Sequence, residues 1–249
     1  MSPRFSTLVR NGGWAGRLSA GTGFFGPTFL TEESEAAGLS RLTVPRPLVA
    51  ERGRSASLDV TRAIGPAAAT VTLFASRIEN PVHVERSTDF VLSNLVTPTT
   101  NRGVELIGTL RREPVELTAT YTYVNSRETV GNRREEVPLT PRHTIAAVGM
   151  IELEGRGRIG LEGYYTGRQR LELNPFREES PAYFIAGFLA ELRFGRARLF
   201  LNGENLTDVR QSRWDPLLLP SRAADGQWTV DQWAPLEGRV LNAGLRWNF

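Results

Sequence analysis

The sequence contains no cysteine and only two histidines, His83 and His143, which lie far apart in the chain. Without cysteine, neither disulfide bonds nor thiolate metal sites can form. Two histidines at distant positions give no basis for a histidine-based metal site. We therefore expect no metal and no other cofactor.

Long apolar stretches are also missing. No run of 18 or more apolar residues occurs, hydrophobic residues make up 40%, and mean hydropathy is -0.26. These values exclude a helical membrane protein. They do not exclude a transmembrane β-barrel, because each of its strands needs only about 9 to 11 residues with a single apolar face.

Lysine is absent as well, so all 30 basic residues are arginines, and 27 acidic residues balance them along the chain. This even distribution argues against a nucleic-acid partner. No Ser-His-Asp order, phosphate-binding glycine loop or supported pair of acids stands out, so we predict no catalytic residue and no enzyme. Residues 1–10 lack the apolar core of a signal peptide, which leads us to expect upstream sequence in an exported protein.

What the sequence does contain is strict alternation. In residues 239–249, the apolar positions Leu241, Ala243, Leu245, Trp247 and Phe249 alternate with polar or small ones, which predicts a strand with one apolar face. Ten earlier segments are also predicted strands, most of them from similar alternation, and the segment 142–153 from its position alone. The strands cover approximately 4–10, 14–20, 55–60, 69–76, 89–112, 115–123, 142–153, 158–165, 183–194 and 196–206.

The connections between these strands alternate in length. Short ones fall at 11–13, 63–67, 113–114, 154–156 and 195, and long ones at 23–52, 79–88, 126–141, 169–181 and 207–236. Short periplasmic turns and long external loops are typical of an outer-membrane barrel. If the C-terminus is periplasmic, the first strand enters from outside. Bacterial barrels have even strand numbers, so we expect these eleven strands to be part of a larger barrel.

Several segments resemble motifs of TonB-dependent receptors. Asn202–Asp208 resembles their N-x-x-N-L-x-D motif, and Pro138–His143 resembles their P-x-x-P-x-H motif. Weaker similarities follow the family's order at 19–28, 94–106, 117–123 and 160–167. The resemblance implies an all-β fold, an antiparallel transmembrane β-barrel of 22 strands. Residues 1–249 would form its C-terminal part, without the plug domain and the N-terminal strands.

The same resemblance implies a function. The parent protein would take up a scarce ligand, such as a ferric siderophore, cobalamin or a similar nutrient, across the outer membrane of a Gram-negative type bacterium. Its partners would be outer-membrane lipid, the plug domain, TonB and the barrel-assembly machinery. That machinery would recognise the C-terminal aromatic signal Trp247 and Phe249, for which membrane-facing packing is the alternative.

Ligand-contacting residues are expected in the last long connection, where Trp214, Trp228 and Trp233 are candidates. The alternative is aromatic packing among loops or at the membrane interface. We also expect the charged residues of the strands to point into the lumen, namely Arg102, Glu105, Glu204 and Arg246. The ligand itself cannot be read from the sequence.

Two other classes of protein fit parts of the pattern. One is a complete small outer-membrane pore or β-barrel binding protein, which would need one more strand. The other is a soluble β-rich binding protein, which would be monodisperse without detergent.

Overall fold

A computed structural model describes residues 2–28, 42–86, 89–223 and 226–247. In this part of the chain, no helix is both long and apolar enough to span a membrane. The elements are β1 (Arg4–Asn11), β2 (Trp14–Phe25), β3 (Leu42–Thr43), β4 (Glu51–Ile64), β5 (Ala67–Glu79), β6 (Val82–Arg86), β7 (Phe90–Asn94), β8 (Thr99–Arg112), β9 (Val115–Val130), β10 (Arg133–Glu136), β11 (His143–Leu153), β12 (Gly157–Thr166), β13 (Tyr183–Phe194), β14 (Ala197–Glu204), the short helix η2 (Gln211–Arg213) and β15 (Val240–Trp247).

One antiparallel sheet forms the body of the structure, in the order β1-β2-β4-β5-β8-β9-β11-β12-β13-β14-β15. The sheet has twelve strands in all, and the eleven on this path agree in number with the eleven predicted strands. β10 pairs with the last residues of β9 to form a hairpin outside this path. β3, β7 and β6 form a separate small sheet. The single strand predicted over 89–112 was wrong. It is divided between β7 and β8, with Pro98, which has no backbone N–H to donate, in the connection.

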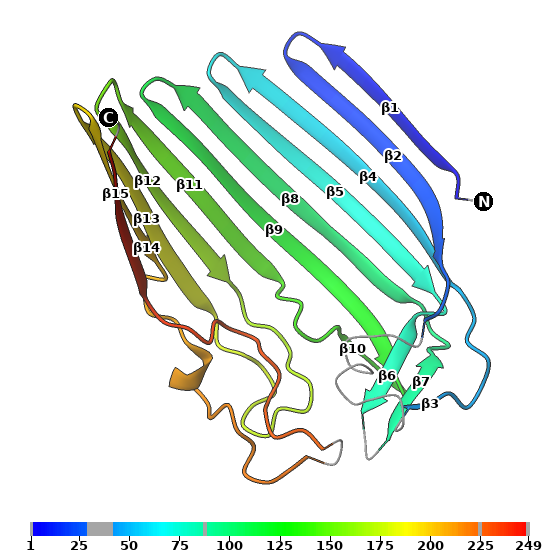
Figure 1. The fold of residues 1–249 in the computed structure, drawn as a ribbon. Helices are drawn as coiled ribbons and strands as arrows, with labels where there is room; N and C mark the ends of the chain where they lie inside the picture. Colours follow the sequence, from blue (N-terminus) through cyan, green and yellow to red (C-terminus); the bar gives the residue numbers. More distant parts are fainter. Residues whose placement is uncertain (1, 29–41, 87–88, 224–225, 248–249) are drawn as a thin grey trace.

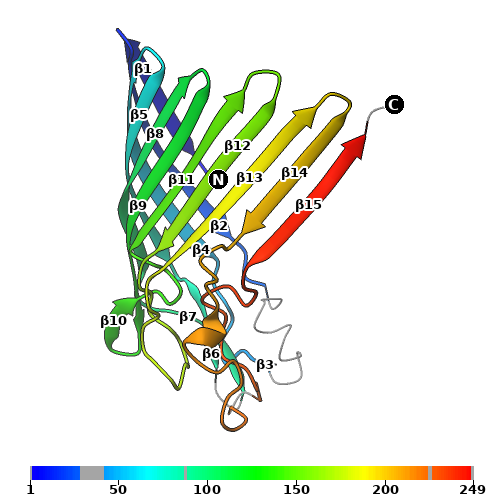
Figure 2. The ribbon, with the colours of Figure 1, turned by 90° about the vertical axis from the view of Figure 1, so that its left-hand side faces the viewer.

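The connections also alternate between short and long, as predicted. Short turns lie together at one end of the sheet and long connections at the other (Figures 1 and 2). The sheet curves into an open wall with β1 and β15 at its edges. β1 starts at the loop end, and β15 finishes at the turn end. Gly195 in the β13–β14 turn has φ of +59°, a conformation in which glycine avoids a side-chain clash.

The cross-strand register gives the sheet two chemically different faces. Leu58 lies opposite Leu73, and Leu73 opposite Val104, so these apolar side chains share a face. On the other face Asp59 lies opposite Thr72, whose hydroxyl donates to the Asp59 carboxylate at 2.9 Å. In a transmembrane barrel the apolar face meets lipid and the polar face lines the lumen.

The register corrects one predicted orientation. Glu105, Glu204 and Arg246 lie on the polar face, as expected. Arg102 lies opposite Ala75, an even number of residues from the apolar positions of β8, and so belongs to the apolar face. The charge of Arg102 led to the wrong predicted face, because this residue lies beyond the loop-side end of the apolar stretch, where a charged side chain is tolerated on that face.

Phenyl rings cover glycines on neighbouring strands. Phe74 lies directly opposite Gly103, and a Cβ added to Gly103 would lie 2.5 Å from that ring and 2.1 Å from the backbone oxygen of Tyr123. Phe188 covers Gly203 and Phe200 covers Gly244 in the same manner. Aromatic rings thus fill the space that a missing side chain leaves on the sheet surface.

This packing predicts different effects of alanine at two glycines of β8. Gly103→Ala should destabilise the full-length protein by about 1–3 kcal/mol, because its Cβ overlaps the ring and the backbone. Gly108→Ala is the control, since nothing lies within 4 Å of its added Cβ, and it should change stability by less than about 1 kcal/mol. The measurement is urea unfolding in detergent. Equal effects of the two substitutions would contradict the packing argument.

Candidate functional site at the loop end

The connections at the loop end have a small core of their own. Trp214 and Trp233 have ring centroids 5.3 Å apart, and the ring of Tyr183 lies 6.4 Å from that of Trp214. Leu171 and Ala234 complete the cluster. Trp233 is only 4% exposed, so two of the three candidate tryptophans are packed together inside the loops.

Buried amides hold this core in place. Gln211 is fully buried; its side-chain oxygen accepts from the backbone N–H of Trp233 at 2.8 Å, and its side-chain nitrogen donates to the Asp231 carbonyl at 3.0 Å. Gln169 donates to the Trp233 carbonyl at 2.9 Å from the neighbouring connection. Because buried polar groups are costly without partners, these bonds favour a single arrangement of the two connections. Nothing in the sequence distinguishes these glutamines from solvated ones.

Arg86 joins three connections through ion pairs. From the end of β6 it donates to both carboxylate oxygens of Asp231, at 2.7 and 3.2 Å, and to Glu172 at 3.3 Å. The hydrogen bond to Asp231 raises the pKa of Arg86 above its ordinary value, although burial opposes this. Arg86 therefore remains charged and ties 82–86, 172 and 231 together.

A second pair links two of the same connections. Arg177 donates from Nε and Nη2 to the two carboxylate oxygens of Asp215, at 2.5 and 2.7 Å. Asp215 is 5% exposed, and its hydrogen bond raises the pKa of Arg177. Arg170 pairs with Glu135 of β10, which adds the β9–β11 connection to the group. Planar guanidinium groups suit such two-point contacts with carboxylates.

Two cavities lie beside the Arg86 ion pairs. The larger, of about 740 Å³, has a mixed lining that includes His83, Glu128 and Glu172 together with valine, proline and leucine side chains. The smaller, of about 320 Å³, is lined mainly by apolar residues of the last connection. Arg86 and Asp231 line both. Apolar walls with a few charged groups are the usual chemistry of a small-molecule site.

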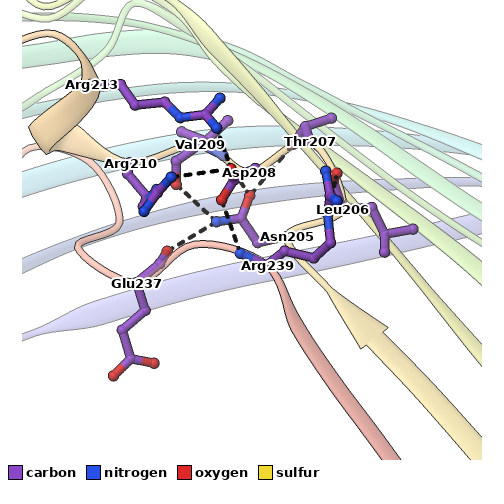
Figure 3. Close-up of polar contacts among 9 residues, drawn as sticks. All are labelled: Asn205, Leu206, Thr207, Asp208, Val209, Arg210, Arg213, Glu237 and Arg239. Atoms are coloured by element: carbon purple, nitrogen blue, oxygen red, sulfur yellow. Dashed lines mark hydrogen bonds and ion pairs between the residues drawn. The ribbon is translucent and has the colours of Figure 1, made fainter.

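The Asn202–Asp208 motif forms the base of the last connection. Asn205, just after β14, accepts from the backbone N–H of Val209 at 2.9 Å and donates to the carbonyls of Val209 and Glu237 at 2.8 and 3.1 Å (Figure 3). Its φ of +48° turns the chain sharply away from the strand. One side chain thus joins the start and the end of the connection.

Asp208 completes this junction. Its carboxylate accepts from the backbone N–H of Arg239 at 3.1 Å and from the side chains of Arg210, at 3.2 Å, and Arg213 (Figure 3). Although desolvation raises its pKa, the Arg239 N–H and the arginine charges outweigh this and hold the pKa of Asp208 below its ordinary value. A Cβ on Gly238 would lie 2.2 Å from the same carboxylate.

The remaining predicted residues lie apart from this cluster. Trp228 is 57% exposed, in a segment where Leu218 and Thr229 form an isolated bridge. Trp247 ends β15 on the apolar face and is 55% exposed. Phe249 lies outside the described residues.

Comparison with known proteins decides the family. Residues 1–206 match the family model described as "TonB dependent receptor-like, beta-barrel". The chain belongs to this family. A search of curated proteins gives no significant match.

Solved structures agree with TonB-dependent receptor architecture. The ferric-catecholate import receptor Fiu of E. coli K12 has a TM-score of 0.69 at 14% identity, over 97% of this chain and 34% of that one. The ferripyoverdine receptor of the outer membrane of Pseudomonas aeruginosa scores 0.68 at 12% identity, over 100% and 33%. The siderophore receptor PirA of Acinetobacter baumannii scores 0.70 at 14% identity, over 100% and 41%. The chain thus spans about a third to two fifths of the length of these receptors.

The Arg86 ion pairs predict a local effect. Arg86→Ala should leave the sheet intact but speed hydrogen exchange in 227–233 by about tenfold, which corresponds to a loss of about 1.4 kcal/mol. Arg168→Ala is the control, because Arg168 is exposed and has no hydrogen bond or ion pair among the described residues. Unchanged exchange in 227–233 would show that the loops are held without Arg86.

The lowered pKa of Asp208 predicts a pH dependence. Its carboxylate stabilises the fold fully above its ordinary pKa, and this contribution is lost as pH falls through the lower folded value. Asp208→Asn should therefore be less stable than the wild type at about pH 7, and the gap should narrow towards about pH 3. Unfolding midpoints at both pH values measure the gap. Glu237→Gln is the control, because its side chain points away from the junction in Figure 3, and it should be as stable as the wild type at both pH values. A difference in stability between Asp208→Asn and the wild type that does not change with pH would contradict the role of the charge.

Proposed function

We propose that this chain is the wall and external-loop part of a receptor for TonB-energised uptake of a scarce ligand, such as a ferric siderophore, cobalamin or a similar nutrient. Family membership supports the receptor class. The observation that carries the ligand-binding part is the cavity of about 740 Å³ at the loop end, with its mixed apolar and charged lining. Three similar structures are named as receptors for ferric catecholates, ferripyoverdine and siderophores.

We also propose the partners of the chain, namely the plug domain, TonB and the barrel-assembly machinery, from its family membership. Residues 1–249 would form the C-terminal part of the barrel domain, and the plug domain and TonB would act with it in the outer membrane. Support comes from the solved receptors, of which this chain matches only about a third to two fifths. Trp247 and Phe249 would serve as the signal for the barrel-assembly machinery, which fits the position of Trp247 at the turn end of β15.

Among the candidate tryptophans, Trp228 is best placed to meet a ligand from outside. Its side chain is 57% exposed, whereas Trp233 is 4% exposed and packs against Trp214. We propose that Trp228 contacts the ligand directly and that Trp214 and Trp233 hold the loop in the shape that binds it. An exposed aromatic side chain offers a large contact area at a low cost in conformational entropy.

Uptake of radiolabelled iron from a panel of ferric siderophores, with labelled cobalamin in parallel, tests the proposal. Cells that carry the full-length gene should accumulate one of these ligands, and deletion of the gene or of TonB should abolish uptake. Fractionation should place the protein in the outer membrane. Passage of small solutes that does not require TonB would favour a simple pore instead, and monodisperse protein without detergent would contradict both membrane functions.

Trp228→Ala should weaken ligand binding by about 1–3 kcal/mol, or roughly 5- to 150-fold in Kd, without changing the folded fraction. Trp14→Ala is the control, since Trp14 is 53% exposed but lies at the turn end of the sheet. Binding is measured by fluorescence titration of the purified receptor with the ligand identified by uptake. Equal binding by Trp228→Ala and the wild type would remove Trp228 from the site.

A further inference from the structure

The apolar face of the sheet changes character near its loop end. On that face Arg54 lies opposite Arg77, Arg77 opposite Thr100, and Thr100 opposite Arg127. Arg102 lies one pair closer to the apolar stretch. These side chains and that of Arg134 in β10 form an arginine band, defined as Arg54, Arg77, Arg102, Arg127 and Arg134.

Arg134 joins the band through contacts of its own. Its guanidinium donates to the hydroxyl of Thr100 at 2.6 Å and to that of Thr129 at 3.3 Å. The band therefore crosses β4, β5, β8, β9 and β10 without a gap in the register.

Polar aromatic side chains mark the level at which the band begins. Tyr123 lies opposite Val104 on the apolar face, and its ring centroid is 5.2 Å from that of His143. The hydroxyl of Tyr121 is 2.9 Å from Nδ1 of His143. Such side chains collect at the interface between membrane and water. Arg102 is two residues beyond Val104, or about 7 Å farther along the strand, which is the level of lipid headgroups.

The positive charge of the band is only partly neutralised. Arg54 and Arg77 share the carboxylate of Glu79, at 3.9 and 3.7 Å, and their side chains are 69% and 55% exposed. Arg127 pairs with Glu136 at 3.4 Å. The side chain of Arg102 forms no hydrogen bond or ion pair within the described ranges. The five arginines of the band thus have only two carboxylate partners, Glu79 and Glu136, which leaves a net positive charge.

A hollow of about 620 Å³ lies within the band. Three of its arginines, Arg102, Arg127 and Arg134, line it together with Thr100 and Asn125. Guanidinium groups bind phosphate oxygens through paired hydrogen bonds, and hydroxyl and amide groups add further donors. The hollow borders the apolar face directly, so a ligand with both a phosphate and an acyl chain matches it better than a free ion.

We propose that the arginine band binds the phosphate of a lipid headgroup in the outer leaflet, with the acyl chains of that lipid lying along the apolar face. This inference rests on the membrane location given under Proposed function, but not on the identity of any transported ligand. The bound lipid fixes the height of the wall in the membrane beside the external loops.

Native mass spectrometry of the full-length protein in detergent tests the proposal, with diphosphoryl lipid A, its dephosphorylated form and inorganic phosphate as separate probes. The wild type should bind the diphosphoryl lipid. The double variant Arg102→Gln, Arg134→Gln should bind it roughly 10- to 30-fold more weakly, since each arginine near a charged headgroup contributes about a factor of five. Higher salt should weaken wild-type binding.

Arg112→Gln is the matched control. Arg112 lies on the same strand and the same face as Arg102, at the opposite end, and is also exposed; its removal should leave lipid binding unchanged. The single variant Arg102→Gln removes no contact within the described ranges, so it tests the site without loss of the fold, which heat-modifiable gel mobility verifies.

Four results would overturn the proposal. They are equal lipid binding by the double variant and the wild type, an equal loss in Arg112→Gln, binding of the dephosphorylated lipid as tight as that of the diphosphoryl form, and competition by inorganic phosphate at the concentration of the lipid. Absence of the protein from the outer membrane on fractionation would instead contradict the membrane location itself, which separates the two kinds of failure.

Discussion

Backbone pairing across an unbroken antiparallel ladder is the constraint on which this structure depends. Along the path from β1 to β15, each inner strand pairs with the strands of this sheet that come before and after it in the order β1-β2-β4-β5-β8-β9-β11-β12-β13-β14-β15. Every pair is antiparallel and in continuous register. Lipid offers no partner for a backbone N–H or C=O group, so a membrane wall must satisfy these groups through its own ladder. Once the ladder is set, the face of every side chain follows from its position in the strand.

A single-layer sheet has no hydrophobic core between layers. The few buried apolar residues of the described chain, which include Phe90, Leu92, Leu171 and Trp233, lie in the connections or the small sheet. The connections must therefore be stabilised separately, by buried amides and by arginine–carboxylate pairs such as Arg86 with Asp231. These contacts leave cavities beside them, whereas a well-packed core would leave few. The ligand site proposed above therefore lies at the loop end.

The strands could be predicted from the sequence because alternation reports directly on the two faces. The number and order of the eleven strands along the main sheet, and their long-short connections, follow from local patterns in the chain. The short strands β3, β6 and β10 were not predicted, and β7 was not separated from β8. The partners of Gln211 or Arg86 could not be predicted, because these contacts join residues from different connections and no local pattern marks them. The orientation of Arg102 was predicted wrongly for a related reason. Its charge indicated the lumen, but parity with Val104 places it on the apolar face, beyond the stretch where charge is excluded.

The junction at Asn205 and Asp208 fixes the position of β15 separately from the conformation of the connection that precedes it. Asp208 accepts from the N–H of Arg239, the residue before β15, and so fixes where that strand begins. A shift of one residue would turn Leu241 and Leu245 to the polar face, since side chains alternate with a period of two. Because Asn205 also binds the Glu237 carbonyl, both ends of the connection are held at its base. The sequence between them can therefore change without moving the strand that follows.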